Sequence, residues 1–385
     1  IDSIYKKCSS ETKAAFPVDQ FKSGFSQLKT QLGNIVSTEF VKYVAPVATY
    51  KTKFEKNEML LDLAVNAQNQ YLVLFFKNPE QKAGLTLDAS LTETPYLIKT
   101  LSGNLSGTLV KPKNADAKVP LVLIIAGSGP TDRNGNNVSA KLMANTYALL
   151  ANELGKKGIA TLRYDKRGVG QSVSSTKESE SRIDDMIEDA VVILNDVNEK
   201  NEFSKLVILG HSEGSLVGML ATNDVPVKGF ISVAGAGEPA DKLMTEQMKT
   251  QPPLVADGFK RVVDSLRRGK LTPVIEPNLY RFARPSIQLY LMSWFRFDPA
   301  RELKRLKMPI LIAHGTTDLQ LGVQQAEKLK KAKSDAQLLI IPNMNHVLKE
   351  APADAKLNME TYANPSLPIK PELITGIVDF VNKLK

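Results

Sequence analysis

The segment 206–216 constrains the fold more than any other part of the chain. Four apolar residues, 206–209, lead into Gly210-x-Ser212-x-Gly214, and a segment typical of a helix follows. A serine on a sharp turn between strand and helix projects its hydroxyl above a parallel sheet. Glycines flank such a serine because a Cβ there would collide with the neighbouring backbone. The segment therefore predicts a buried strand, an exposed nucleophile at Ser212 and a helix.

The chain from about residue 96 to residue 385 has the rhythm of an α/β protein. Near-continuous apolar runs, typical of strands covered on both faces, alternate with segments of helical periodicity. Residues 105–110 read as an early antiparallel strand. The expected parallel strands are 119–126, 159–164, 206–209, 229–234, 309–313 and 337–341, and the expected helices include 140–157, 183–199, 323–332 and 371–384. This order predicts a doubly wound, mostly parallel sheet.

The alternation breaks at about 237–307, which we interpret as a helical cap inserted over the site. It contains an aromatic cluster, Tyr290, Trp294, Phe295 and Phe297, and much of the chain's positive charge. An apolar face with aromatic residues would line a pocket for the acyl or leaving group, while Lys and Arg face solvent. The alternative is a helical excursion with a solvated, charged side.

Residues 1–95 read as a separate, small α+β domain. Apolar residues recur at helical spacing over 19–32, and short apolar runs follow at 44–50, 59–65, 71–76 and 85–91. This part contains no histidine and no glycine-rich loop, so we find no catalytic constellation in it. Two interpretations stay open: a module that recruits substrate or a partner, and a module that stabilises or oligomerises the protein.

The charge distribution argues against a nucleic-acid partner. Thirteen Lys or Arg and five Asp or Glu lie between Lys249 and Lys307, which accounts for almost all of the net charge of +9. A localised basic segment is a patch on one element, whereas the rest of the chain is close to neutral. It favours, as a hypothesis, anionic substrates or an anionic surface. No apolar run approaches the roughly 18 to 20 residues of a membrane helix, so we expect no integral membrane segment.

Cysteine and histidine counts limit the chemistry further. Cys8 is the single cysteine, so an internal disulfide and a thiolate metal site are excluded. Three histidines make a multi-histidine metal cage improbable, and we expect neither a metal nor a cofactor. The chain begins at Ile1 rather than Met, and the hypothesis is that a secretion signal preceded it, which would place the protein outside the cytoplasm.

A serine nucleophile requires a base and a third group that orients the base. His346 lies in a loop directly after the last expected strand, so it can hang over the edge of the sheet where Ser212 sits. His211 adjoins the nucleophile but points to a different side, and His314 ends a strand. By elimination and position His346 is the expected base, and the other two histidines are expected to be structural.

The acid is expected after a strand edge and between serine and histidine in the chain. Asp318, just beyond the strand at 309–313, meets both conditions. The rivals are Glu238 and Asp241, which follow the preceding strand. The order Ser212, Asp318, His346 is the chain order of hydrolases with a serine on such a turn.

The oxyanion of an acyl-transfer intermediate needs backbone donors. One is the N–H of Glu213, directly after the nucleophile, and the other is expected from the glycine-rich loop 127–135, at Ser128. The carboxylate of Glu213 would repel the developing charge, so it must point away or be paired. Arg133 is one candidate partner, and a cationic group of the substrate is the other.

Five motifs in this order carry a family resemblance: 127–135, 163–172, 210–214, 315–318 and Asn345-His346. The set resembles the α/β-hydrolase superfamily, and specifically bacterial esterases and serine-aminopeptidase-like hydrolases, over about residues 100–385. The resemblance implies a structural role for the turn 165–172. It also implies that the protein is not a long-chain lipase, because Ala126 stands where a lipase has histidine. Residues 1–95 are similar to an uncharacterised α+β module sometimes found ahead of these hydrolases.

The sequence thus favours a serine hydrolase that cleaves small-molecule carboxylic esters, with short acyl chains, through an acyl-enzyme. Ser212, His346 and Asp318 would be nucleophile, base and acid. Cleavage of peptides or amides by the same residues is the second hypothesis. A binding protein that retains the fold without turnover is the third.

Overall fold

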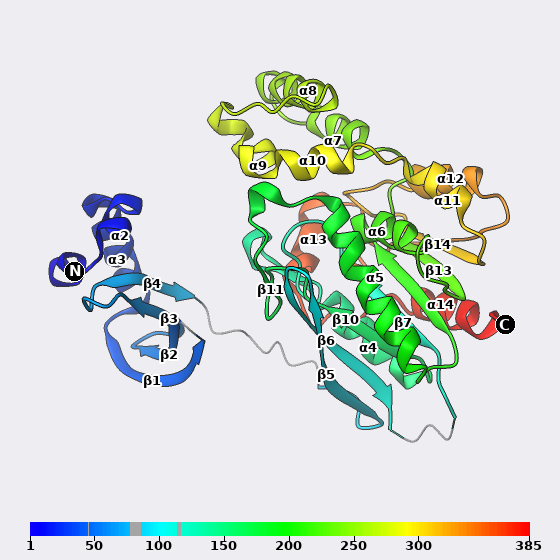
Figure 1. The fold of residues 1–385 in the computed structure, drawn as a ribbon, viewed down its shortest axis with the longest axis horizontal. Helices are drawn as coiled ribbons and strands as arrows, with labels where there is room; N and C mark the ends of the chain where they lie inside the picture. The colour runs from blue at the N-terminus through cyan, green and yellow to red at the C-terminus, as the bar shows by residue number, and fades with distance from the viewer. Residues whose placement is uncertain (45, 78–85, 114–116) are drawn as a thin grey trace. The chain divides into compact units, whose positions relative to one another are not determined.

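The computed structural model describes residues 1–44, 46–77, 86–113 and 117–385 (Figure 1). Contacts within the chain divide it into two compact units, Ile1–Gly84 and Leu85–Lys385. Strand β5 (Leu91–Thr100) pairs along its whole length with β6 (Gly103–Pro112) of the larger unit. The boundary at residue 95, and the reading of each unit as a domain, stay predictions.

The first unit is an antiparallel sheet with three helices, as expected for an α+β module. Phe21 and Phe25 of α3 stack with ring centroids 4.5 Å apart, and Phe25 meets Phe76 of β4 edge-on, so this helix packs on the sheet. The sheet order is β1-β2-β3-β4. The elements are α1 (Asp2–Lys6), α2 (Ser10–Ala15), α3 (Val18–Leu32), β1 (Ile35–Val44), β2 (Val47–Phe54), β3 (Glu58–Val65) and β4 (Tyr71–Lys77).

The second unit is built on a nine-stranded sheet in which six neighbouring strands, extending to one edge, are parallel. Along the sheet the order is β11-β6-β10-β7-β12-β13-β14-β15, and β5 extends it as the antiparallel partner of β6. The fully buried strands β7, β10, β12, β13 and β14 are the apolar runs of the sequence. Besides β5 and β6, the strands are β7 (Leu121–Ile125), β10 (Ala160–Tyr164), β11 (Val173–Ser174), β12 (Leu206–His211), β13 (Gly229–Val233), β14 (Ile310–Gly315) and β15 (Gln337–Ile341).

Helices cover both faces of this sheet, which confirms the doubly wound α/β class (Figure 1). On one face lie α5 (Ile183–Lys200), α6 (Glu213–Ala221), α11 (Pro299–Arg305) and α12 (Gln324–Ala332), which share one apolar core. On the other face α4 (Thr146–Lys156) and α14 (Pro371–Lys383) share a second core. The short helix α13 (Ala355–Glu360) precedes α14.

The break in the alternation is a helical cap, as expected. It contains α7 (Ala240–Met248), α8 (Pro253–Arg267), α9 (Tyr280–Ala283) and α10 (Gln288–Trp294). Figure 1 shows these helices as a group separate from the layers of the sheet. They have a core of their own, with Phe259, Val262 and Leu266 of α8 buried against Leu279 and Leu291. The cap is therefore a small folded layer and can form one wall of a pocket.

Candidate active site

Ser212 occupies a strained turn between β12 and α6. Its backbone has φ 55° and ψ −121°, a conformation that residues other than glycine rarely adopt. A Cβ on Gly210 would lie 2.3 Å from the carbonyl oxygen of Gly214, and a Cβ on Gly214 would lie 2.2 Å from that of Ile125. Both contacts are forbidden, so the two flanking glycines let α6 pack against β7 directly after the serine.

The structure brings His346 and Asp318 together beyond the ends of β15 and β14. The Nδ1 of His346 lies 2.7 Å from Oδ2 of Asp318, and both side chains are buried. The other oxygen, Oδ1, accepts hydrogen bonds from the backbone N–H groups of Gln320 and Leu321. Burial raises the pKa of Asp318, but the His346 charge and these hydrogen bonds outweigh it, so the pKa lies below its usual value.

Ser212 and His346 line one small cleft of about 60 Å³. A carboxylate that accepts the Nδ1 proton of an imidazole leaves Nε2 of that ring as the basic atom. A hydroxyl in the same cleft can pass its proton to this atom when it attacks a carbonyl. Ser212 thus shares a cleft with His346, and His346 is hydrogen-bonded to Asp318.

His211 has a structural environment. The hydroxyl of Tyr147 accepts a hydrogen bond from the Gly127 N–H at 3.0 Å, so it donates its own proton to Nδ1 of His211 at 2.8 Å. The Nε2–H of His211 then donates to the backbone carbonyl of His346 at 2.9 Å. Burial lowers the pKa of His211 to about 3. A neutral His211 thus connects the loop after β7 to the loop that carries His346.

His314 is also held in the interior. Its Nε2 lies 2.6 Å from the carbonyl oxygen of Leu321, to which it donates, and 3.7 Å from Oδ2 of Asp318. Burial lowers its pKa as well. His314 is therefore neutral, and its hydrogen bond to Leu321 holds the loop that carries Asp318.

The two rival acids have other partners. Asp241 lies in the cap helix α7 and pairs with Arg267 of α8 at 3.2 Å. Glu238 pairs with Lys328 and accepts a hydrogen bond from the Gln325 side chain. Of the three candidate acids, Asp318 is the one that the structure joins to His346.

The expected oxyanion donors lie beside the nucleophile, but the expected partner of Glu213 is wrong. Ser128 and Glu213 line the same pocket as Ser212. Arg133 pairs instead with Asp165 at 2.6 Å, and Nζ of Lys166 lies 2.9 Å from Oε1 of Glu213. The loop after β7 turns the Arg133 side chain toward β6, where it donates to the Gly107 carbonyl rather than to Glu213.

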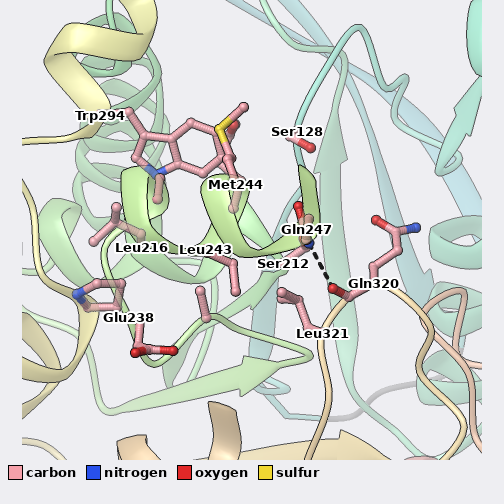
Figure 2. Close-up of a pocket in the computed structure, with 14 residues that line it drawn as sticks. Ser128, Ser212, Leu216, Glu238, Leu243, Met244, Gln247, Trp294, Gln320 and Leu321 are labelled. Atoms are coloured by element: carbon pink, nitrogen blue, oxygen red, sulfur yellow. Dashed lines mark hydrogen bonds between the residues drawn. The ribbon is translucent and has the colours of Figure 1, made fainter. Parts of the chain in front are cut away.

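A second, larger pocket of about 180 Å³ lies between Ser212 and the cap (Figure 2). Apolar side chains from α6, α7, α10 and the loop after β14 form most of its wall, and the Glu238 carboxylate lies at its edge. Across its mouth, the Gln247 side chain of α7 donates to the carbonyl oxygen of Gln320 at 2.8 Å. The larger apolar wall residues are Leu216, Leu243, Met244, Trp294 and Leu321, and the smaller ones are Ala236, Ala240 and Pro299.

Within the described residues, no group of three or more His, Cys, Asp and Glu side chains is placed to hold a metal ion. Among the helices of the same residues, none has the length and apolar character needed to cross a membrane.

Two sequence comparisons bear on this site. Residues 142–278 match the family model described as serine aminopeptidase, S33. The chain is 25% identical over 361 residues to esterase EstD from Thermotoga maritima, and the match covers 90% of this chain and 84% of that protein. Both matches include the segment around Ser212.

Comparison with solved structures identifies the fold. Est1E from Butyrivibrio proteoclasticus, solved with bound ferulic acid, has a TM-score of 0.50 and 18% sequence identity, covering 75% of this chain and 100% of that chain. An esterase from Pyrococcus furiosus has a TM-score of 0.49 and 16% identity, covering 77% of this chain and 92% of its own. The larger unit thus has the architecture of Est1E.

Proposed function

We propose that the chain is a serine hydrolase of the α/β-hydrolase superfamily and that it cleaves small-molecule carboxylic esters through an acyl-enzyme. The observation that carries the proposal is the 2.7 Å contact between His346 Nδ1 and Asp318 beside a serine on a strained turn. The similarity to esterase EstD supports esters as the substrate class. Esters are also more reactive than amides toward acyl transfer, because an alkoxide leaves more readily than an amide ion.

In the proposed mechanism, Ser212 Oγ attacks the ester carbonyl carbon while His346 Nε2 takes its proton. The negative charge that develops on the carbonyl oxygen is stabilised by the backbone N–H groups of Ser128 and Glu213. His346 then gives the proton to the departing alkoxide, and water releases the acyl group by the same steps in reverse order. Asp318 keeps the imidazole oriented and stabilises its charged form.

The two pockets assign the two halves of the ester. The leaving oxygen must lie near His346, because this residue protonates it, and His346 lines the small cleft of about 60 Å³. We infer that the alcohol enters this cleft and the acyl group enters the pocket under the cap. That pocket, about 180 Å³, is close to the size of a cavity of roughly 150 Å³ that holds a benzene ring. A volume of this size supports a preference for short acyl groups, of about six carbon atoms.

The acyl group is expected to be neutral. The charged side chains among the pocket's lining residues are Glu213 and Glu238, which pair with Lys166 and Lys328, so this lining offers an anionic acyl group no cation to pair with. The basic segment of the cap remains a candidate for attracting anionic molecules over longer range. A kcat/KM for anionic esters that is independent of salt concentration would count against such steering.

Replacement of the nucleophile tests the proposed function. The Ser212→Ala variant should lose hydrolysis of p-nitrophenyl acetate by on the order of 10⁴-fold or more in kcat, and it should no longer be labelled by a fluorophosphonate. Ser215→Ala is a matched control, because Ser215 lies one turn later in α6 and its hydroxyl bonds that of Ser232. An Ser212→Ala variant that kept full activity would refute the proposal.

Amide cleavage is the second candidate, and the match to the serine aminopeptidase model favours it. Rates on an ester and an amide that share one acyl group separate the two. A higher kcat/KM for the amide would reassign the enzyme as a peptidase or amidase.

A further inference from the structure

The turn Asp165-Lys166-Arg167 after β10 contains three consecutive charged residues, and each contacts a different element. Asp165 accepts hydrogen bonds from the backbone N–H of Arg133, at 2.8 Å, and from its guanidinium, at 2.6 Å. Arg167 pairs with Asp189 of α5 at 2.8 Å. Lys166, between them, contacts Gly127 and Glu213, the residue that follows Ser212. The turn therefore links the loop after β7 and the start of α6 in one network of ion pairs and hydrogen bonds.

Lys166 contacts both segments that carry the proposed oxyanion donors. Its Nζ donates to Oε1 of Glu213 at 2.9 Å and to the backbone carbonyl oxygen of Gly127 at 3.0 Å. Gly127 precedes the donor Ser128, and Glu213 is itself the second donor. The side chains of Lys166 and Glu213 are 11% and 1% exposed, so water screens this ion pair weakly.

The environment of Glu213 makes an uncompensated charge costly. Burial, followed by the nearby Glu213 carboxylate, raises the pKa of Tyr290 in cap helix α10 well above its ordinary value. The carboxylate therefore acts on its neighbours through a medium of low polarity. The oxyanion would form next to the backbone of this same residue. Two negative charges a few ångströms apart repel strongly in such surroundings.

We propose that Lys166 is a positioning residue of the oxyanion hole, which neutralises Glu213 and holds the Gly127 carbonyl so that the Ser128 amide faces Ser212. The inference rests on the proposed function of Ser212 and the two amides. It assigns to Lys166 a role in transition-state stabilisation. No contact between Lys166 and the substrate is required.

Charge removal in two steps tests this role. The readout is the rate at which p-nitrophenyl phosphonate esters label Ser212, because this reaction needs the oxyanion hole but no natural substrate. Lys166→Met should slow the maximal labelling rate by about 10- to 100-fold, below the 10²–10³-fold typical for loss of a donor. The phosphonate concentration that gives half of the maximal labelling rate should differ from that of the parent protein by less than about threefold. The double variant Lys166→Met/Glu213→Gln carries no charge at either position. It should be labelled at least about tenfold faster than Lys166→Met.

Rescue separates charge compensation from a general need for the turn. Arg167→Met alters the same turn without touching Glu213, so it is expected to lower thermal stability while labelling stays within about threefold of the parent protein. A double variant as slow as Lys166→Met, or a Lys166→Met variant as fast as the parent, would overturn the proposal. If Lys166→Met fails to fold by circular dichroism, Lys166→Arg and the double variant decide: both must retain labelling within about tenfold of the parent.

The same experiment keeps the two proposals apart. A parent protein that is labelled at Ser212 but hydrolyses no ester contradicts the proposed function. The labelling rates of the variants would still report on Lys166 in that case.

Discussion

At the scale of single residues, the decisive feature is the Asp318 carboxylate. It is buried, yet it stays ionised because His346 and two backbone N–H groups stabilise the charged form and keep its pKa below the usual value. An ionised Asp318 accepts the Nδ1 proton of His346. The ring is thereby fixed in the tautomer in which Nε2 can act as a base. Tautomer and orientation, rather than charge alone, are what this residue contributes.

Substitution of the two candidate acids by their amides tests this role. Asp318→Asn should lower kcat on p-nitrophenyl acetate by about 10³- to 10⁴-fold, because an amide can present its N–H₂ to Nδ1 and stabilise the wrong tautomer. Asp241→Asn, which removes a charge that pairs with Arg267, should stay within a few-fold of the parent protein. A larger loss of turnover in Asp241→Asn would move the acid to the cap.

The positions of the proposed site residues, including the contact between His346 and Asp318, could be predicted from the sequence. Ser212, Asp318 and His346 each follow a strand of the parallel sheet, so the fold itself brings them to one edge. The partners of buried charged residues were harder to predict from the sequence. The pairing of Glu213 with Lys166 depends on how the turn after β10 bends toward α6, and local sequence does not determine that bend. The motif 163–172, which contains Lys166, was nevertheless the sequence signal that could have drawn attention to this turn.

At the scale of elements, the proposed function gives the cap the role of selecting the acyl group. Leu243 and Met244 of α7 and Trp294 of α10 form its side of the larger pocket, and the Gln247 hydrogen bond to Gln320 ties the cap to the loop that bears Asp318 (Figure 2). The wall is therefore held in place relative to the catalytic side chains. A larger side chain in this wall should shorten the acyl group that is accepted.

Leu243→Phe is the corresponding prediction. It should lower kcat/KM for a p-nitrophenyl hexanoate by at least about tenfold relative to the acetate, because each methylene excluded from an apolar pocket costs about 0.8 kcal/mol. Leu254→Phe makes the same change at a position of α8 that is 65% exposed, and it should not alter the ratio. Equal losses for acetate and hexanoate would place the acyl group elsewhere.

Elements with a clear apolar period were predicted well, and those shaped by pairing partners were not. The parallel strands and most helices of the larger unit lie within a few residues of their expected positions. Strands β1 and β5 were missed, since their residues alternate poorly and both are stabilised by antiparallel neighbours. Of the expected strand 85–91, residue 85 lies outside the described residues and 86–90 form no strand. Helix α4 begins at Thr146 rather than 140, because a tight turn and two short strands precede it.

At the scale of the whole molecule, the sheet buries ionisable groups that must stay neutral for the protein to fold. His211 is one of them, since burial lowers its pKa to about 3, whereas the unfolded chain has the ordinary value of 6.5. Between these two values the unfolded chain binds one proton more than the folded protein. The contribution of His211 to stability is thus complete above pH 6.5 and is lost progressively as the pH falls toward 3.

The prediction concerns how steeply the free energy of unfolding depends on pH, rather than its absolute value. His211→Asn removes this proton uptake, so the free energy of unfolding should depend less steeply on pH between 6.5 and 3, by up to about 1.4 kcal/mol per pH unit. Urea unfolding followed by the fluorescence of Trp294, the single tryptophan, measures the slope for the larger unit. Ser215→Ala also removes a buried hydrogen bond but no ionisable group, so it should lower stability and leave the slope unchanged. Identical slopes in the parent protein and His211→Asn would mean that His211 takes up its proton in the folded state. The bridge between Tyr147 and the His346 carbonyl would then have to open at mildly acidic pH.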